Sequence, residues 1–189
     1  TKRAMIRAMH EMNSDTGALA DAARDPIDWR ALVNKIKGWV LELGFAELGI
    51  ARADVSAASP GLLRWLELGR HGEMHYMAKH AALRSEPPAL VAGTRSVISA
   101  RLPYWPAATD ASTVLADGEL GYISRYTLGR DYHKTLRQRL QKLAERIGEA
   151  VAERSEPYSY RVFADSAPVM EVEFARQSGI AWRGKHTLS

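Results

Sequence analysis

The chain has 189 residues, of which 46% are apolar and 25% are charged, proportions that are ordinary for a soluble globular domain with a substantial core. It contains no cysteine, which excludes disulfides, zinc–thiolate sites, a cysteine nucleophile and cysteine-ligated clusters from this sequence. The formal net charge is +4 at pH 7, and neither a membrane-length apolar run nor a targeting pattern is present, so the sequence favours a cytoplasmic protein without a membrane partner.

The first part of the chain is predicted to form an extension, a helix and a strand. Residues 1–27 are expected to be helical or disordered. Asp28 is a favourable N-cap, and Gly44 is a suitable stop for the helix between them. Apolar residues repeat in this helix at helical spacing: Val33, Ile36, Val40 and Leu43. Residues 44–53 are predicted to be a loop that leads into a short buried strand.

The middle of the chain is predicted to be helical up to its best strand. Ser59-Pro60 starts a helix because proline suits the first helical position, and Leu62, Leu63 and Leu66 lie on it. Residues 71–90 indicate a short helical stretch that Pro87-Pro88 interrupts. Residues 96–104 are rich in β-branched side chains and predict a strand, whereas 105–118 are typical of a loop.

The last third alternates strands with helices. Residues 121–127 and 158–164 are predicted to be strands, and 168–177 a helix that ends at Gly179. A long amphipathic helix is predicted from about Tyr132 to Glu153, with one apolar stripe: Leu136, Leu140, Leu143, Ile147 and Val151. This alternation predicts an α/β domain, in which sites collect where strands end and helices begin.

Asp165 lies at such a place, between the last predicted strand and the last predicted helix. One interpretation is a helix N-cap, a role that contributes about 1 kcal/mol. The other is a general acid, because Phe163, Ala164 and Val169 make an apolar setting that favours the protonated carboxyl group. A helix N-terminus would instead favour the carboxylate. On position alone, the cap is the preferred interpretation.

Three further features carry candidate chemistry. Asp131 is predicted to cap the long helix, and His133 is either a ligand or a first-turn surface residue. Arg84 precedes a strand in a segment punctuated by proline and glycine, where it could grip an anionic ligand or lie on the surface. Residues 125–146 hold seven Arg or Lys and two acidic residues, a net charge of +5 that suits RNA but is also typical of a solvated helix face.

Two familiar motifs are absent. The loop Gly184-Lys185-His186 resembles a phosphate-binding loop, but His186 stands where that motif has Ser or Thr and no strand precedes it. Asp131-x-His133 begins the cobalt-ligating motif Asp-x-His-x-x-Gly, but Leu136 replaces its glycine. The sequence therefore predicts neither a nucleotide P-loop nor a histidine-ligated cobalamin of that type.

Three segments in series resemble tRNA epoxyqueuosine reductase, the cobalamin-dependent enzyme family of queuosine synthesis. They are HGEMHYMAKHAALRSEPPALVAGTRSVI at 71–98, RYTLGRDYHKTLR at 125–137 and DSAPVMEVEFARQSGIAWRGKHTL at 165–188. The resemblance extends from about residue 30 to the end of the sequence. Thr127 replaces the family's usual alanine, and Arg183 stands where an apolar residue is more usual.

The resemblance implies a truncated, mixed-sheet cobalamin-binding catalytic domain over 28–189, related to nitroreductases and reductive dehalogenases. A ferredoxin-like segment with two [4Fe-4S] clusters would follow in the family, so the sequence alone is expected to be inactive. The partner implied is tRNA carrying epoxyqueuosine, bound by a cytoplasmic monomer.

The resemblance also assigns roles to individual residues. Asp165 would be the proton donor and would adjoin cob(II)alamin. The other cofactor-binding candidates are Arg84, Ser124, Arg125, His133, Met170, Lys185 and His186. Two alternatives remain open: a cobalamin- or RNA-binding module without redox activity, and a flavin-binding, nitroreductase-like protein.

Overall fold

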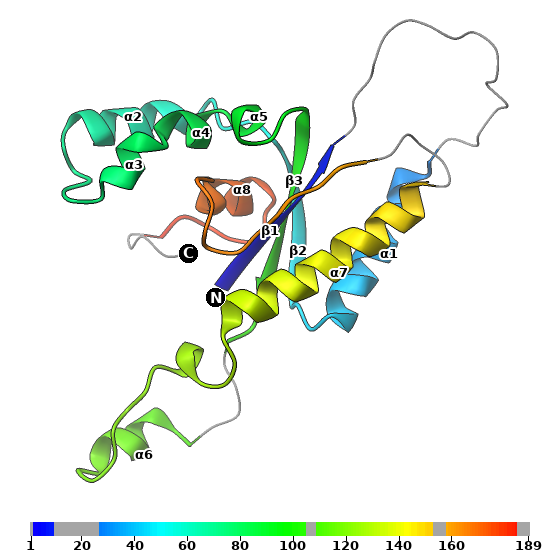
Figure 1. Ribbon diagram of the computed structural model, residues 1–189. Helices are drawn as coiled ribbons and strands as arrows, with labels where there is room; N and C mark the ends of the chain where they lie inside the picture. The colour runs from blue at the N-terminus through cyan, green and yellow to red at the C-terminus, as the bar shows by residue number, and fades with distance from the viewer. Residues whose placement is uncertain (1, 10–26, 105–108, 153–157, 185–189) are drawn as a thin grey trace, which may run out of the picture.

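The computed structural model describes residues 2–9, 27–104, 109–152 and 158–184, with only the backbone described for 2–9. A four-stranded sheet carries helices on both faces (Figure 1). All three strand pairings are antiparallel, so the predicted combination of helices and strands is confirmed and the predicted mixed sheet is wrong. The strands, in the spatial order β2-β3-β1-β4, are β1 (Lys2–Met9), β2 (Glu47–Arg52), β3 (Thr94–Leu102) and β4 (Val162–Phe163).

Strand β1 corrects the prediction for the start of the chain. Residues 2–9 form a strand between β3 and β4, with Ile6 in register with Ile98 on one side and Val162 on the other. The expectation of a helical or disordered segment is therefore wrong for these residues. Alanine and methionine favour helix in isolation. Pairing with two strands that lie far away in the sequence overrides that local preference.

One face of the sheet is covered by α1 (Trp29–Glu42) and α7 (Tyr132–Ala152). Asp28 caps α1 as predicted, because its carboxylate accepts a hydrogen bond from the backbone of Ala31 at 3.0 Å. All five residues of the stripe predicted for α7 are buried. They pack with α1 against residues of β2 and β3: Leu48, Ile98 and Ala100.

The opposite face is covered by α8 (Glu171–Gln177), whose Phe174 is fully buried against β3 and β4. Helix α8 lies close to β2 because Gly49 has no side chain. A Cβ atom at that position would lie 2.6 Å from the carbonyl oxygen of Ser178. The predicted last helix is confirmed, although it begins three residues later than expected.

Four short helices follow β2 and lie together beyond one end of the sheet: α2 (Ser59–Glu67), α3 (His75–Lys79), α4 (Ala81–Ser85) and α5 (Pro87–Leu90). The predicted helix start at Ser59-Pro60 is confirmed. Pro87-Pro88 do interrupt the helical stretch, but they also open α5, because proline is tolerated in a first helical turn.

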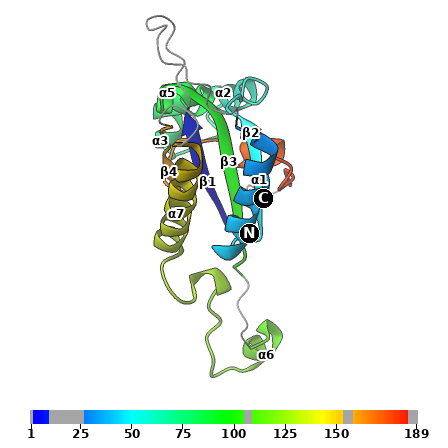
Figure 2. The ribbon, with the colours of Figure 1, turned by 90° about the vertical axis from the view of Figure 1, so that its right-hand side faces the viewer.

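The segment from Thr109 to Asp131 projects from the body of the molecule (Figure 2). It contains α6 (Ala111–Ala116), where a loop was predicted, and the 3₁₀ turn η1 (Arg125–Thr127), where a strand was predicted. Tyr122 and Ile123 are 43% and 62% exposed. The alternating pattern of 121–127 therefore finds no sheet edge to pair with. No helix among the described residues is long and apolar enough to cross a membrane.

Candidate acid site at Asp165

Asp165 lies two residues after the end of β4 and does not cap α8. The residue that precedes α8 is Met170, and the turn between 164 and 170 separates Asp165 from the helix. Asp165 is the non-glycine residue of the described chain that has a positive φ, +55°. Aspartate tolerates this left-handed conformation better than most residues do. The interpretation of Asp165 as the cap of the last helix is therefore wrong.

Two aromatic side chains from the first turn of α7 hold the Asp165 carboxyl group. The Tyr132 hydroxyl donates a hydrogen bond to Oδ2 of Asp165 at 2.7 Å. Nε2 of His133 lies 3.7 Å from the same oxygen, while its Nδ1 lies 3.1 Å from Asp131. The two rings stack with centroids 3.9 Å apart. Both contacts fall on Oδ2.

Asp131 fixes the helix turn that presents these rings. Its carboxylate accepts a hydrogen bond from the backbone of His133 at 2.9 Å, so its predicted capping role is confirmed. This bond is also the main reason that the pKa of Asp131 is lowered. Desolvation, followed by the bond to Asp165, raises the pKa of Tyr132 to about 12. Tyr132 therefore stays protonated at neutral pH and acts as a donor to Asp165.

Asp165 borders an open hollow of about 620 Å³ between α8 and the helices that follow β2. Arg84 and Met170, two further predicted site residues, line the same hollow. Arg84 belongs to α4, and its guanidinium lies 6.0 Å from the ring centre of Tyr76. The rest of the lining combines apolar and charged residues: Leu62, Tyr76, Met77, Ala167, Val169, Glu171, Val172, Glu173, Arg183 and Gly184. This lining suits a large ligand with an apolar face and polar edges.

The other predicted site residues lie elsewhere. Ser124 is exposed at the start of η1 and lines neither this hollow nor the second one described below. Arg125 is 8% exposed, and its guanidinium donates to the carbonyl oxygen of Thr109 at 2.7 Å. Lys185 and His186 fall outside the described residues. The fold thus unites Arg84, Asp165 and Met170, places His133 against Asp165, and separates Ser124 and Arg125 from them.

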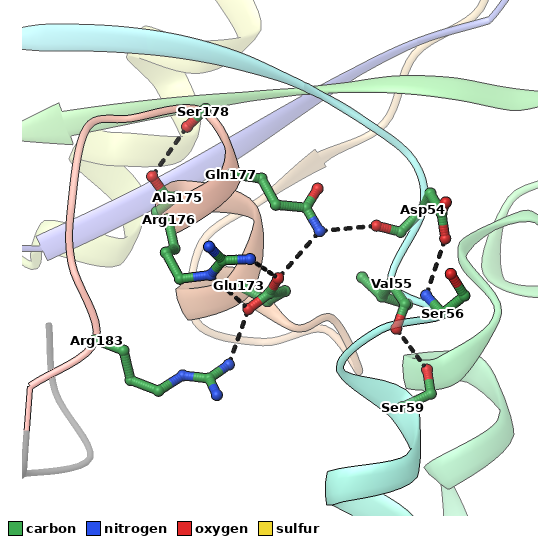
Figure 3. Close-up of polar contacts among 10 residues, drawn as sticks. All are labelled: Asp54, Val55, Ser56, Ser59, Glu173, Ala175, Arg176, Gln177, Ser178 and Arg183. Carbon is green, nitrogen blue, oxygen red and sulfur yellow. Dashed lines mark hydrogen bonds and ion pairs between the residues drawn. The ribbon is translucent and has the colours of Figure 1, made fainter.

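Glu173 is a site residue that sequence reasoning missed (Figure 3). Its side chain is only 4% exposed, yet it pairs with Arg176 at 2.6 Å and Arg183 at 2.8 Å. Gln177 donates to Glu173 at 3.1 Å and to the carbonyl oxygen of Asp54 at 2.9 Å. Glu173, Arg176 and Gln177 are spaced at i, i+3 and i+4 on one helix, a spacing that predicts contacts among their side chains. This network ties Arg183, and with it the rim of the hollow, to α8.

Replacing Glu173 with glutamine should lower the free energy of unfolding by about 1–2 kcal/mol at neutral pH, because hydrogen bonds to a charged group are lost. The bond from Arg176 is the main cause of the lowered pKa of Glu173. A lowered carboxyl pKa stabilises the fold above its ordinary value of 4.5, and this contribution disappears as the pH falls through the folded-state pKa. Urea unfolding should show that the difference in the free energy of unfolding between the wild type and Glu173→Gln disappears below pH 4.5. A gap independent of pH would contradict this role.

Known proteins resemble this chain over most of its length. The family model described as epoxyqueuosine reductase QueG, DUF1730, matches residues 84–166. Epoxyqueuosine reductase from Alicycliphilus denitrificans is 53% identical over 83% of this chain and 44% of its own length. The proteins of that name from Burkholderia pseudomallei and Escherichia coli are 48% and 46% identical over 93% and 87% of this chain, which correspond to 46% and 42% of their own lengths.

A solved structure supports the fold. Epoxyqueuosine reductase from Streptococcus thermophilus superposes with a TM-score of 0.60 and 24% identity, over 79% of this chain and 39% of that chain. At this identity the likeness concerns the architecture alone. Residues 84–166 match the QueG DUF1730 family model, and the chain is similar to epoxyqueuosine reductases over somewhat less than half of their length.

Proposed function

We propose that this chain supplies the acid-bearing, cobalamin-binding part of an enzyme that reduces epoxyqueuosine to queuosine at the wobble position of tRNA. The observation that carries the proposal is the Asp165 carboxyl group, held by Tyr132 and His133 at the border of a ligand-sized hollow. Relatives named for this activity are 46–53% identical, which supports the choice of reaction.

The reaction needs a proton donor at the epoxide. Conversion of an epoxide into an alkene consumes two electrons and two protons, and the oxygen leaves as water. Asp165 gives a proton to this oxygen as its bond to carbon breaks, which is general acid catalysis. Tyr132 then stabilises the resulting carboxylate through its hydrogen bond to Oδ2. His133 is exposed and lies between Asp131 and Asp165, so it can return a proton from solvent to Asp165.

The lining of the hollow beside Asp165 supports cobalamin as its ligand. The corrin ring needs an apolar surface, which Leu62, Val169 and Met170 provide, and its amide side chains need polar partners, which Arg84 and Arg183 provide. No histidine lines this hollow among the described residues. Reduced cobalt supplies electrons when the cofactor is bound. Because this sequence lacks cysteine, two [4Fe-4S] clusters of the usual thiolate type would be ligated outside it.

The proposal is tested with the full chain, cobalamin, a strong chemical reductant and an RNA stem-loop that carries epoxyqueuosine. Mass spectrometry of the digested RNA should show a nucleoside lighter by one oxygen atom. Cobalamin binding, followed by visible absorbance, is measured in parallel. Binding without the product indicates a module without redox activity. Bound flavin in place of cobalamin indicates the nitroreductase-like alternative.

Tyr132→Phe should lower turnover by about tenfold or more while leaving cobalamin affinity unchanged. The variant keeps the ring that stacks on His133 but loses the donor to Asp165, a charge-assisted bond that contributes about 1.5–3 kcal/mol. Tyr132 does not line the hollow beside Asp165, so its loss should spare the cofactor. Single-turnover rates and a cobalamin titration measure the two effects. Tyr122→Phe is the matched control, because this exposed tyrosine lines neither hollow, and an equal loss of rate in it would argue against the role of Tyr132.

A further inference from the structure

A second hollow, of about 1060 Å³, lies on the other side of Tyr132 and carries cationic side chains, so it is called the basic hollow here. It is bounded by the end of α1, the end of β3, η1 and the outer face of α7. Lys134, Gln138 and Lys142 recur on α7 at intervals of four residues, next to the stripe that faces the core. The face of α7 that the core does not use therefore lines the basic hollow.

The charge of the basic hollow is unbalanced. Five cationic side chains line it, against the two carboxylates Glu42 and Asp131. Both carboxylates are already engaged, Glu42 by Arg146 at 2.6 Å and Asp131 by the first turn of α7. Among the described residues, no carboxylate lies within ion-pair distance of Arg130, Lys134, Arg139 or Lys142. The hollow therefore favours a polyanion.

One of these cations lies against the backbone at the end of α1. The guanidinium of Arg139 packs directly over Gly44, where a Cβ atom would lie 2.7 Å from Nη1. Gly44 also has a φ of +79°, a left-handed backbone conformation that favours glycine. The guanidinium of Arg139 thus lies between the end of α1 and α7.

Exposed aromatic rings accompany the cations. Tyr104 and Tyr126 line the basic hollow and are 39% and 48% exposed. Tyr126 meets Tyr132 edge to face, with ring centres 6.4 Å apart. Tyr132 lines the basic hollow and also donates to Asp165, so it joins this hollow to the acid site. Exposed aromatic rings beside cations are typical of surfaces that bind unpaired nucleotides.

We propose that the basic hollow binds the RNA strand next to the reacting nucleotide. Lys134 and Lys142 contact its phosphates, and Tyr126 stacks with an unpaired base. The inference rests on the proposed function for the identity of the RNA, but not for the binding itself. A strand in the hollow would end beside Tyr132 and so deliver the next nucleotide to Asp165.

The test is fluorescence anisotropy of the full chain with a labelled, unmodified RNA stem-loop over a range of salt concentrations. The double variant Lys134→Gln/Lys142→Gln should weaken binding and reduce the slope of log affinity against log salt by about 1.4, or about 0.7 for each lost phosphate contact. Tyr126→Ala should weaken binding about tenfold with an unchanged slope, because stacking is not electrostatic. Lys35→Gln/Lys37→Gln is the matched control, since it removes two exposed lysines from α1 that do not line the hollow.

Because the RNA is unmodified, binding is measured without turnover. The RNA-binding result can therefore be interpreted even if the protein does not reduce epoxyqueuosine. Equal losses of RNA affinity in the two lysine double variants would indicate a general effect of net charge and overturn the proposal. An unaffected affinity in Lys134→Gln/Lys142→Gln would overturn it as well. The exposed positions of these lysines predict unchanged thermal unfolding, which circular dichroism checks.

Discussion

Asp165→Asn should lower the rate of epoxyqueuosine reduction by about 10²–10⁴-fold, the usual contribution of a positioned general acid. The substitution tests the proton alone. Asparagine has almost the same shape, and its amide oxygen can still accept the hydrogen bond from Tyr132. It also tolerates the φ of +55° at this position, whereas alanine would add backbone strain. Single-turnover kinetics with chemically reduced cobalamin measure the effect.

Two controls separate this chemistry from binding. Cobalamin affinity of Asp165→Asn should match that of the wild type, because the apolar lining and Arg84 are unchanged. Asp117→Asn alters a carboxylate in the projecting segment that caps only a local turn, so it should react at the wild-type rate. If Asp165→Asn retained turnover, the proton would come from another group, and the assignment of Asp165 would fail.

The sequence predicts the parts of the fold that local patterns determine. The stripe of α7, the cap at Asp28 and the strand at 96–104 follow from periodicity and capping, and the structure contains all three. Strand β1 could not be predicted in this way, because its partners are supplied by residues about 90 and 160 positions further along the chain. Residues 121–127 show the converse, since a strand-like pattern without a neighbouring edge does not form a strand.

In the candidate site, too, the sequence predicts local features but not the contacts between distant elements. The proximity of Asp165 to a helix start is local information, but the sequence suggested the wrong helix. The aspartate meets the first turn of α7, 33 residues earlier in the chain, rather than the start of α8. Glu173 was missed because its partner Arg183 lies beyond the end of its helix. Contacts between elements depend on how the sheet brings their ends together, and a single sequence does not record this.

The second large effect is expected from Phe174→Ala, which should lower the free energy of unfolding by about 3–5 kcal/mol. Phe174 is fully buried in the smaller core beneath α8, where Ala167, Val169 and Met170 pack against it. These three residues also line the hollow beside Asp165. A cavity at Phe174 should therefore loosen the turn that carries Asp165 as well as destabilise the fold. Urea unfolding measures the first effect and cobalamin affinity the second.

Leu140→Ala is the matched control, because Leu140 is equally buried but belongs to the larger core between the sheet, α1 and α7. Leu140→Ala should lower the free energy of unfolding by about 2–5 kcal/mol and leave cobalamin affinity unchanged. If either variant unfolds, the milder pair Phe174→Leu and Leu140→Val keeps the comparison, at about 1 kcal/mol each. The two cores lie on opposite faces of one sheet. The smaller one packs beneath Ala167, Val169 and Met170, which line the hollow, whereas Tyr132 packs against the larger one. Equal losses of cofactor affinity in both variants would show that global stability, and not the packing beneath α8, sets the geometry at Asp165.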